Sequence, residues 1–191
     1  MKEAIGGSYL FIIVITFLAL FSGFIAMATN YSRSFKVKDE IITQITKSNG
    51  VNNETLSGIS AYLNYIGYSS VGYCPDSADN RYCAFTKGNG AGEDVSSYYK
   101  NSHKDSNYCI QKHVAAGTAS DFAGKNENVL TSEAVGHFQA AYYSVRVFFS
   151  MDIPILRNII NIDIDGDTAL IYSPNDITQM KNCSMYQHQH S

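Results

Sequence analysis

The 191-residue sequence has no tryptophan, only three prolines and few charged residues, which make up 16% of the chain. Proteins that bind nucleic acid through a basic surface need a high local density of Lys and Arg. The formal net charge here is −3, so we expect no nucleic-acid partner. Charge is missing altogether between Glu3 and Arg33, which makes the N-terminal end the most informative part of the sequence.

Motifs of the common catalytic classes are also missing. The chain has no G-x-S-x-G, no glycine-rich phosphate loop and no H-E-x-x-H, each of which places reactive groups at a fixed spacing. His103, His113 and His137 have no carboxylate or cysteine at a motif distance, and His188 and His190 lie in the C-terminal tail, where chains commonly fray. We therefore expect neither enzyme activity nor a cofactor.

Three aspartates at alternate positions superficially resemble the start of a calcium-binding loop: Asp163, Asp165 and Asp167. An EF-hand loop that began at Asp163 would need Gly at its sixth position and Glu at its twelfth. The chain has Thr168 and Pro174 at these positions. We therefore expect an acidic hairpin turn without metal.

The N-terminal segment over residues 9–28 is apolar almost throughout. Twenty residues of α-helix rise about 30 Å, which matches the hydrocarbon core of a bilayer. This length predicts a transmembrane anchor with the lipid bilayer as a partner. The residues expected to contact lipid or partner helices are Tyr9, Phe11, Phe17, Phe21, Phe24 and Ala28.

The helical pattern continues beyond the apolar segment. Ile41 and Ile45 extend a spacing of three to four residues that begins at Phe35, with charged residues on the other face. The Asn-Gly pair at 49–50 then supplies a helix stop. We predict one helix from about residue 5 to residue 48, roughly 65 Å long.

A secretory signal peptide is the alternative interpretation of the N-terminus. Lys2 would supply its positive charge, and the Ala-Met-Ala sequence at 26–28 would allow cleavage after Ala28. The apolar regions of signal peptides run about 7–15 residues, which is shorter than this segment, so a retained anchor is favoured. Cleavage would instead leave an exported or tethered binding module without catalysis.

All four cysteines follow the apolar segment: Cys74, Cys83, Cys109 and Cys183. None is spaced as a zinc-binding C-x2-C or C-x4-C pair. An even number in a loop-rich domain predicts two disulfides and therefore an oxidising compartment. Three pairings are open, of which Cys74–Cys83 with Cys109–Cys183 is favoured.

The charges that flank the apolar segment conflict with the cysteines over which side of the membrane the domain faces. Arg33, Lys36 and Lys38 outweigh Lys2, and the positive-inside rule would place the domain in the cytoplasm. Disulfides need an oxidising compartment, however, and long domains translocate largely regardless of charge. We therefore predict a single-pass protein of the cell membrane with an extracytoplasmic C-terminal domain.

The remaining chain predicts both helices and strands. Asn52 or Asn53 is suited to cap a second helix over residues 54–66. Alternation of apolar side chains over 138–150 predicts a strand with one apolar face, and the turn dipeptide at 165–166 predicts a hairpin. Further strands are expected at 82–86, 108–114, 161–165 and 168–173, with a short apolar turn or helix at 155–160.

The predicted fold class is therefore α+β. A long N-terminal membrane helix continues into a soluble helix, and a small antiparallel sheet domain carries the disulfides. We assign residues 1–30 to the transmembrane anchor, 31–67 to a helical stalk and second helix, and 68–191 to an exported β-rich domain.

Two stretches resemble type IV pilin-like proteins and, more closely, the TadE-like proteins of tight-adherence pilus systems. Residues 4–47 share the long helix that is first lipid-embedded and then solvent-facing. Residues 142–172 (YYSVRVFFSMDIPILRNIINIDIDGDTALIY) share the order of strand, proline-bearing turn, apolar segment and closing strand. The resemblance implies a structural component of a bacterial surface pilus or secretion apparatus, with other pilin-like or pilus-assembly proteins as partners of the N-terminal helix.

The same resemblance implies a leader that is cut after Gly7, before Ser8. Pilin-like proteins usually carry Glu at the fifth mature position, which in this chain is Ile12. The chain therefore departs from the pilin pattern at a residue that accompanies leader processing and filament incorporation.

Overall fold

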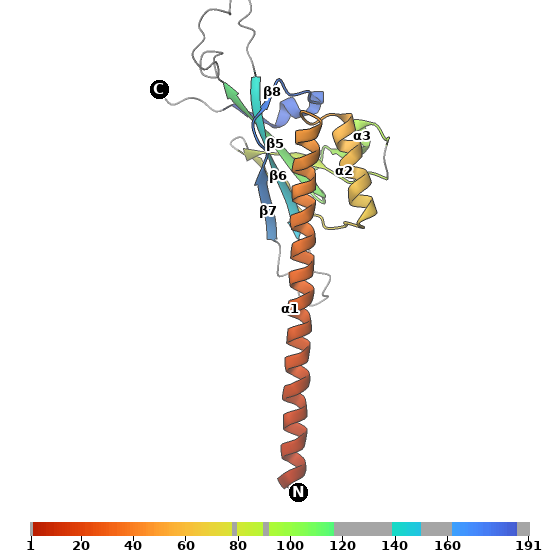
Figure 1. The fold of residues 1–191 in the computed structure, drawn as a ribbon, viewed down its shortest axis with the longest axis vertical. Coiled ribbons are helices and arrows are strands. Elements are labelled where there is room, and N and C mark those ends of the chain that lie inside the picture. Colours follow the sequence, from red (N-terminus) through yellow and green to blue (C-terminus); the bar gives the residue numbers. More distant parts are fainter. Residues whose placement is uncertain (1, 78–79, 90–91, 117–138, 150–161, 187–191) are drawn as a thin grey trace, which may run out of the picture.

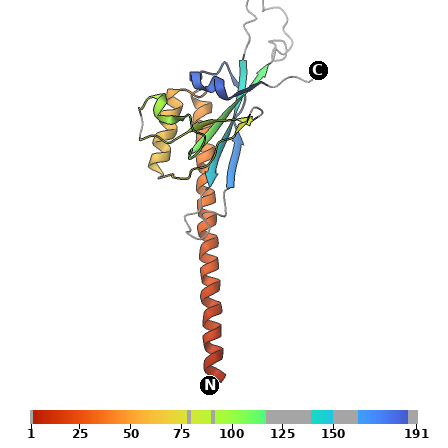
Figure 2. The same cartoon turned by 180° about the vertical axis from the view of Figure 1, so that it is seen from behind.

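A computed structural model of the chain describes residues 2–77, 80–89, 92–116, 139–149 and 162–186. A single long helix, α1 (Lys2–Lys47), projects from an α+β domain that is built around its C-terminal half (Figure 1). Seen from behind (Figure 2), the lower part of α1 extends well below the sheet. The 46 residues of α1 rise about 69 Å. The predicted continuous helix is confirmed.

The end of α1 is set by two residues with left-handed backbone conformations. Asn49 and Gly50 have φ angles of 55° and 132°, and the N–H of Gly50 donates to the carbonyl of Ile45 at 3.0 Å. Asn and Gly adopt positive φ at lower cost than other residues. The predicted stop at this pair is therefore confirmed, and the chain reverses here.

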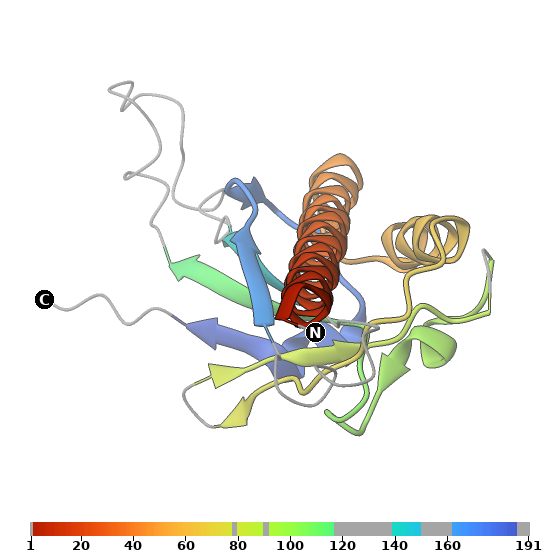
Figure 3. The same cartoon turned by 90° about the horizontal axis from the view of Figure 1, so that it is seen from below.

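The second helix, α2 (Asn53–Tyr65), runs back beside α1, as the view along α1 shows (Figure 3). Asn52 is its N-cap: the Asn52 side chain accepts the N–H of Thr55 at 2.9 Å, and the Thr55 hydroxyl accepts the N–H of Asn52. This reciprocal capping satisfies two backbone donors that the first turn leaves free. The predicted second helix is confirmed.

The other layer of the domain is a mainly antiparallel sheet. In space the strands follow the order β4-β3-β5-β6-β7; β8 pairs with a separate stretch of β6, and β9 pairs in parallel with β5. The strands of this sheet are β3 (Cys83–Phe85), β4 (Tyr99–Lys100), β5 (Tyr108–Ala116), β6 (Gln139–Phe149), β7 (Ile162–Asp167), β8 (Ile171–Tyr172) and β9 (Ser184–Tyr186). A separate two-stranded sheet pairs β1 (Asp76–Ser77) with β2 (Asn80–Arg81), and the short helices are α3 (Val95–Tyr98) and η1 (Thr178–Cys183).

The core lies between α1, α2 and the inner face of the sheet. Tyr143, Val145, Val147 and Phe149 alternate along β6, and all four are buried. The predicted strand with one apolar face is therefore confirmed. Burial of one such Val or Phe side chain contributes about 1.5–3 kcal/mol relative to exposure, so this buried face of β6 contributes substantially to the stability of the domain.

The predicted hairpin at Asp165-Gly166 is wrong. Both residues lie inside β7, which pairs continuously with β6 and places Gly166 opposite Val145. A Cβ atom at Gly166 would lie only 2.6 Å from Cδ of Lys38 on α1. The glycine is therefore present because α1 packs closely on β7 at this point, a cause that a local turn pattern cannot reveal.

The four cysteines form two disulfides as expected, but the favoured pairing is wrong. The bonds join Cys74 to Cys109 and Cys83 to Cys183. Cys83 belongs to the inner core, whereas Cys74 and Cys109 belong to a small cluster that also contains Ala84. Because Ala84 pairs with Cys109 across β3 and β5, neighbouring Cys83 points to the opposite face.

The predicted apolar segment at 155–160 and the tail histidines His188 and His190 lie outside the described residues.

Candidate functional site

The main surface feature is the apolar rod, which we define as residues 9–28 of α1. The predicted lipid-facing residues Tyr9, Phe11, Phe17 and Phe24 are 65–68% exposed, although each is apolar or aromatic. Among the described helices, α1 is long and apolar enough to cross a membrane by length and composition. All six predicted membrane residues lie along this rod, and Gly7 lies in the helical turns that precede it.

Two hydroxyl side chains of the apolar rod, those of Thr16 and Ser22, form hydrogen bonds within the helix itself. The hydroxyls of Thr16 and Ser22 donate to the carbonyls of Ile12 and Ala19 at 2.8 and 2.9 Å. In hydrocarbon an unsatisfied polar group costs several kcal/mol, because no water is present to bond it. The rod therefore offers no unpaired hydroxyl at these two positions that would oppose transfer into lipid.

A pair of small residues on the apolar rod was missed by sequence reasoning. Ala19 and Gly23 are four residues apart and lie on one face of α1. Gly23 comes eleven residues before Ser34, where α1 contacts the sheet. A Cβ atom at Gly23 would have no heavy atom within 4 Å. No contact among the described residues therefore requires a glycine at this position. The small-xxx-small spacing of Ala19 and Gly23, which is visible in the sequence, permits close helix–helix contact in membranes.

The C-terminal half of α1 has the opposite environment. Val37, Ile41 and Ile45 are fully buried against the sheet and α2. Lys38 is also buried, with its ammonium 3.0 Å from the Asp39 carboxylate and 3.8 Å from the centre of the Phe35 ring. One helix thus carries an exposed apolar half and a half that forms the core of a domain.

A groove of about 700 Å³ lies at the junction of the two halves of α1. Ala28 contributes to its apolar side, and the exposed Arg33 and Lys36 lie at its polar end. Tyr62 and Ile66, from the end of α2, form the other wall. Burial, followed by the negative charge of Glu40, raises the pKa of Tyr62, so this phenol stays neutral at ordinary pH.

The C-terminal segment is fastened to the turn between α1 and α2 through one carboxylate. Asp176 accepts the N–H of Val51 at 2.8 Å, the ammonium of Lys112 at 2.6 Å and the hydroxyl of Tyr143 at 2.7 Å. Burial and the nearby Asp176 charge raise the pKa of Tyr143. Residues 173–177 therefore form a clasp that joins the helical turn to the centre of the sheet.

A buried tyrosine, Tyr68, bonds to the sheet at the point where α1 leaves the domain. The Tyr68 hydroxyl donates to the carbonyl of Phe148 and lies 3.2 Å from its backbone nitrogen. Burial raises the pKa of Tyr68 to about 12. The Ser34 hydroxyl of α1 reaches the same carbonyl at 3.5 Å, so helix, sheet and the segment after α2 meet at one point.

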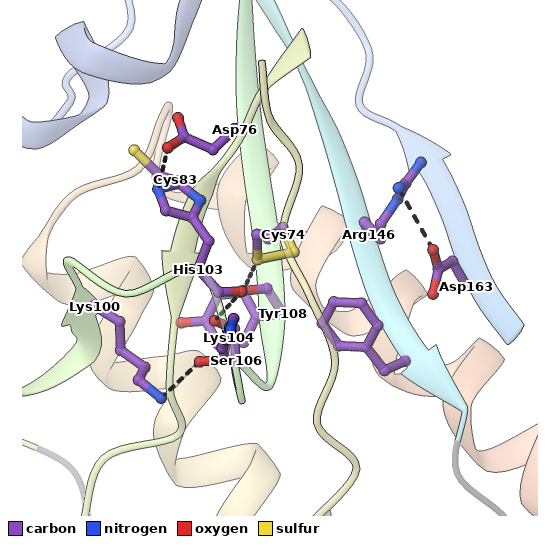
Figure 4. The surroundings of a disulfide bond; sticks show 12 residues. Cys74, Asp76, Cys83, Lys100, His103, Lys104, Ser106, Tyr108, Arg146 and Asp163 are labelled. Atoms are coloured by element: carbon purple, nitrogen blue, oxygen red, sulfur yellow. Dashed lines mark hydrogen bonds and ion pairs between the residues drawn. A yellow bond between two sulfur atoms is a disulfide. The ribbon is translucent and has the colours of Figure 1, made fainter. Parts of the chain in front are cut away.

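The Cys74–Cys109 disulfide fixes the segment after α2 across the outer face of the sheet (Figure 4). A Cβ atom at Gly72 would lie 2.1 Å from the Phe148 ring, so the backbone contacts the ring directly. The N–H of Gly72 donates to Ser106 at 2.9 Å. Figure 4 also shows His103, whose imidazole lies 3.6 Å from the carboxylate of Asp76.

Polar residues on the outer face form a row that differs from a hydrolase triad. Ser144 donates its proton to Asp167 at 2.6 Å and lies 2.9 Å from Nε2 of His113. In a triad the histidine lies between serine and aspartate and accepts the serine proton. Here the serine is central and its proton faces the carboxylate, so His113 is not placed to act as its base. Burial lowers the pKa of His113.

The acidic residues of β7 are engaged by side chains of β6. Arg146 donates to both carboxylate oxygens of Asp165 at 2.7 and 2.8 Å and lies 3.5 Å from Asp163. Burial raises the pKa of Asp163. Across the part of the chain that the structure describes, no group of three or more His, Cys, Asp or Glu residues is placed to hold a metal ion.

Comparison with protein-family models, with characterised proteins and with solved structures gives no match.

Proposed function

We propose that this protein is a single-pass, membrane-anchored, pilin-like structural component of a bacterial surface pilus or secretion apparatus, of the TadE-like kind. One observation carries the proposal. A continuous helix has a mainly exposed, apolar segment over residues 9–28 and then buries its second half in a disulfide-bonded α+β domain. A single helix that serves both as membrane anchor and as domain core holds the domain at a fixed height and orientation above the bilayer.

The disulfides support an extracytoplasmic domain, because they persist in oxidising compartments. The structure also weakens the opposing argument from flanking charge. Lys38 is buried and paired with Asp39, which leaves Arg33 and Lys36 as the exposed basic residues just after the apolar rod. The domain is therefore assigned to the outer side, with the N-terminus on the cytoplasmic side.

The mechanism proposed is mechanical. The apolar rod is held in the bilayer, where it can pack against the helices of other pilin-like subunits. Packing between helices in lipid depends on close contact rather than on the hydrophobic effect, so small residues set the contact face. Ala19 and Gly23 supply such a face, and the two disulfides keep the domain folded outside the cell.

The test begins with the full-length protein in native membranes. We expect it to resist extraction at alkaline pH and to form cross-linked oligomers. Gly23→Ile is expected to lower the oligomer yield severalfold, because the added side chain separates the helices. Phe21→Ile, an apolar change on a different side of the same helix, is the matched control and is expected to leave the yield unchanged.

The intact mass of the native protein distinguishes the outcomes. Loss of residues 1–7 supports a processed pilin, and an unprocessed chain supports a permanent tether with the same fold. Loss of residues 1–28 would contradict the proposal and would favour an exported binding module instead. Full extraction at alkaline pH would also contradict it.

A further inference from the structure

We infer that the groove at the junction of α1 and α2 binds one glycerophospholipid with an anionic headgroup. The inference rests on the proposed membrane anchorage of α1. Among the described residues the groove has about 700 Å³ of space, which suits part of a lipid: an acyl chain beside the apolar rod and a phosphate beside the basic residues.

Polarity increases along the groove in the same direction as it increases from the hydrocarbon core of a bilayer to its headgroup layer. Phe24, Ile25 and Ala28 line the end nearer the rod. Arg33 and Lys36 line the other end, and both are exposed. In the described part of the chain neither of these two cations has a carboxylate within salt-bridge distance. An anionic headgroup would supply the charge that they lack.

The height of the groove agrees with this assignment. If residues 9–28 span the hydrocarbon core, Arg33 lies five residues, about 7.5 Å, above its boundary. The headgroup layer occupies about 5–8 Å on each side of the hydrocarbon core. Arg33 therefore lies at the level of lipid phosphates, while Phe24 remains beside acyl chains. Lys36 lies eight residues, about 12 Å, above the boundary, and its long side chain can extend back to the headgroups.

The second wall has residues that are typical of a membrane interface. Tyr62 and Ile66 come from the end of α2 that lies nearest the apolar rod. Tyrosine is enriched at the level of headgroups, because its ring is apolar and its hydroxyl is polar. Tyr65, between them in sequence, is 89% exposed. This end of the domain therefore combines aromatic side chains and cations beside the rod.

A partner helix is the competing occupant, and charge favours the lipid. A second copy of the apolar rod carries no charged residue between Glu3 and Arg33, so it could not pair with both cations at the polar end. A phospholipid satisfies both ends of the groove at once. One Lys or Arg near a membrane surface increases attraction to anionic lipid by about fivefold.

The experiment uses the full chain in nanodiscs of equal parts dioleoyl-phosphatidylcholine and dioleoyl-phosphatidylglycerol. Native mass spectrometry measures which lipid stays bound after release. We expect one retained phosphatidylglycerol in clear excess over phosphatidylcholine. The double variant R33Q/K36Q is expected to lower this preference about tenfold or more. K47Q/K104Q removes two exposed charges elsewhere and is the matched control, expected to keep the preference.

A third variant tests the apolar end. Ala28→Leu fills the side of the groove beside the acyl chain and is expected to reduce retention of both lipids, whereas R33Q/K36Q changes only the headgroup preference. Three results would each overturn the inference. They are retention of the two lipids in their bulk ratio, an unchanged lipid preference in R33Q/K36Q, and a second protein copy bound in place of lipid. Failure of the wild type to enter nanodiscs would reject both anchorage and lipid binding, whereas entry without lipid preference rejects only the latter.

Discussion

The two halves of α1 have similar apolar residues but opposite environments. Ile15 in the apolar rod is 49% exposed, whereas Ile41 in the upper half is fully buried. The helix between them is unbroken. The two halves therefore share one backbone conformation. They differ in whether the domain covers their apolar side chains.

The difference lies in what covers each half of the helix. The upper half pairs its apolar face with a sheet, so its other face can be polar and hydrated. Among the described residues, the apolar rod packs against the domain core only at its upper end, through Met27. Below that point it is apolar on all sides, a pattern typical of a helix in lipid. The following substitutions separate the two halves experimentally.

The largest effect is expected from removing the Cys83–Cys183 disulfide. Its residues are 100 positions apart, and cross-linking a loop of this length stabilises a fold by about 4.7 kcal/mol in the chain-entropy treatment. The double Cys→Ser variant is expected to lose most of this free energy of unfolding while its rod still enters membranes. Urea unfolding in micelles measures the loss, and the Cys74/Cys109 variant is expected to lose about 1 kcal/mol less, because its loop is shorter.

The next largest effect compares the same substitution in the two halves. Ile41→Ala removes a buried side chain and is expected to cost about 3 kcal/mol of unfolding free energy. Ile15→Ala is the matched control and is expected to leave the unfolding of the domain unchanged. Equal effects of the two variants on urea unfolding would contradict the division of α1.

A third comparison uses two glycines that differ in surroundings. Gly166→Ala places a methyl group against Lys38 and Ile42 of α1 and is expected to cost about 1–2 kcal/mol by overpacking. Gly23→Ala meets open space and is expected not to destabilise the domain. Thermal unfolding measures both variants, and a neutral Gly166→Ala would show that α1 does not approach β7 closely.

The smallest effect concerns alkaline pH. The pKa of Tyr68 is raised from 10.0 to about 12 in the folded protein, so the folded state holds the phenol proton more tightly than the unfolded state. This contribution is complete below pH 10 and is lost as pH rises towards 12. We expect a loss of about 1 kcal/mol by pH 11. Tyr68→Phe should reduce the pH-dependent loss, whereas exposed Tyr65→Phe should not.

Much of the fold could be predicted from periodicity, because α1, α2 and β6 each show one strong repeat. The disulfide pairing and β7 could not. Cys74 and Cys83 are close in sequence but lie on different sides of the sheet. The Asp165-Gly166 pair has the composition of a turn. The glycine is instead required by close packing against Lys38, which is over a hundred residues away in sequence.

The candidate site was predictable only in part. Hydropathy alone marks the apolar rod, and its predicted aromatic residues are exposed as expected for a lipid-facing helix. The junction groove needs the end of α2 beside α1, and no sequence pattern brings Tyr62 next to Arg33. The clasp depends likewise on Asp176 reaching Val51 through tertiary structure.

The most direct test uses the absence of tryptophan from the chain. Phe17→Trp places a unique fluorophore at the middle of the apolar rod, and Tyr172→Trp, in a separate variant, places one on β8, at the far end of the domain (Figure 1). In vesicles that contain lipids brominated deep in the acyl chains, we expect strong quenching of tryptophan fluorescence in the rod variant and none in the β8 variant. Equal quenching in the two variants, or no quenching in the rod variant, would contradict the membrane anchorage of α1.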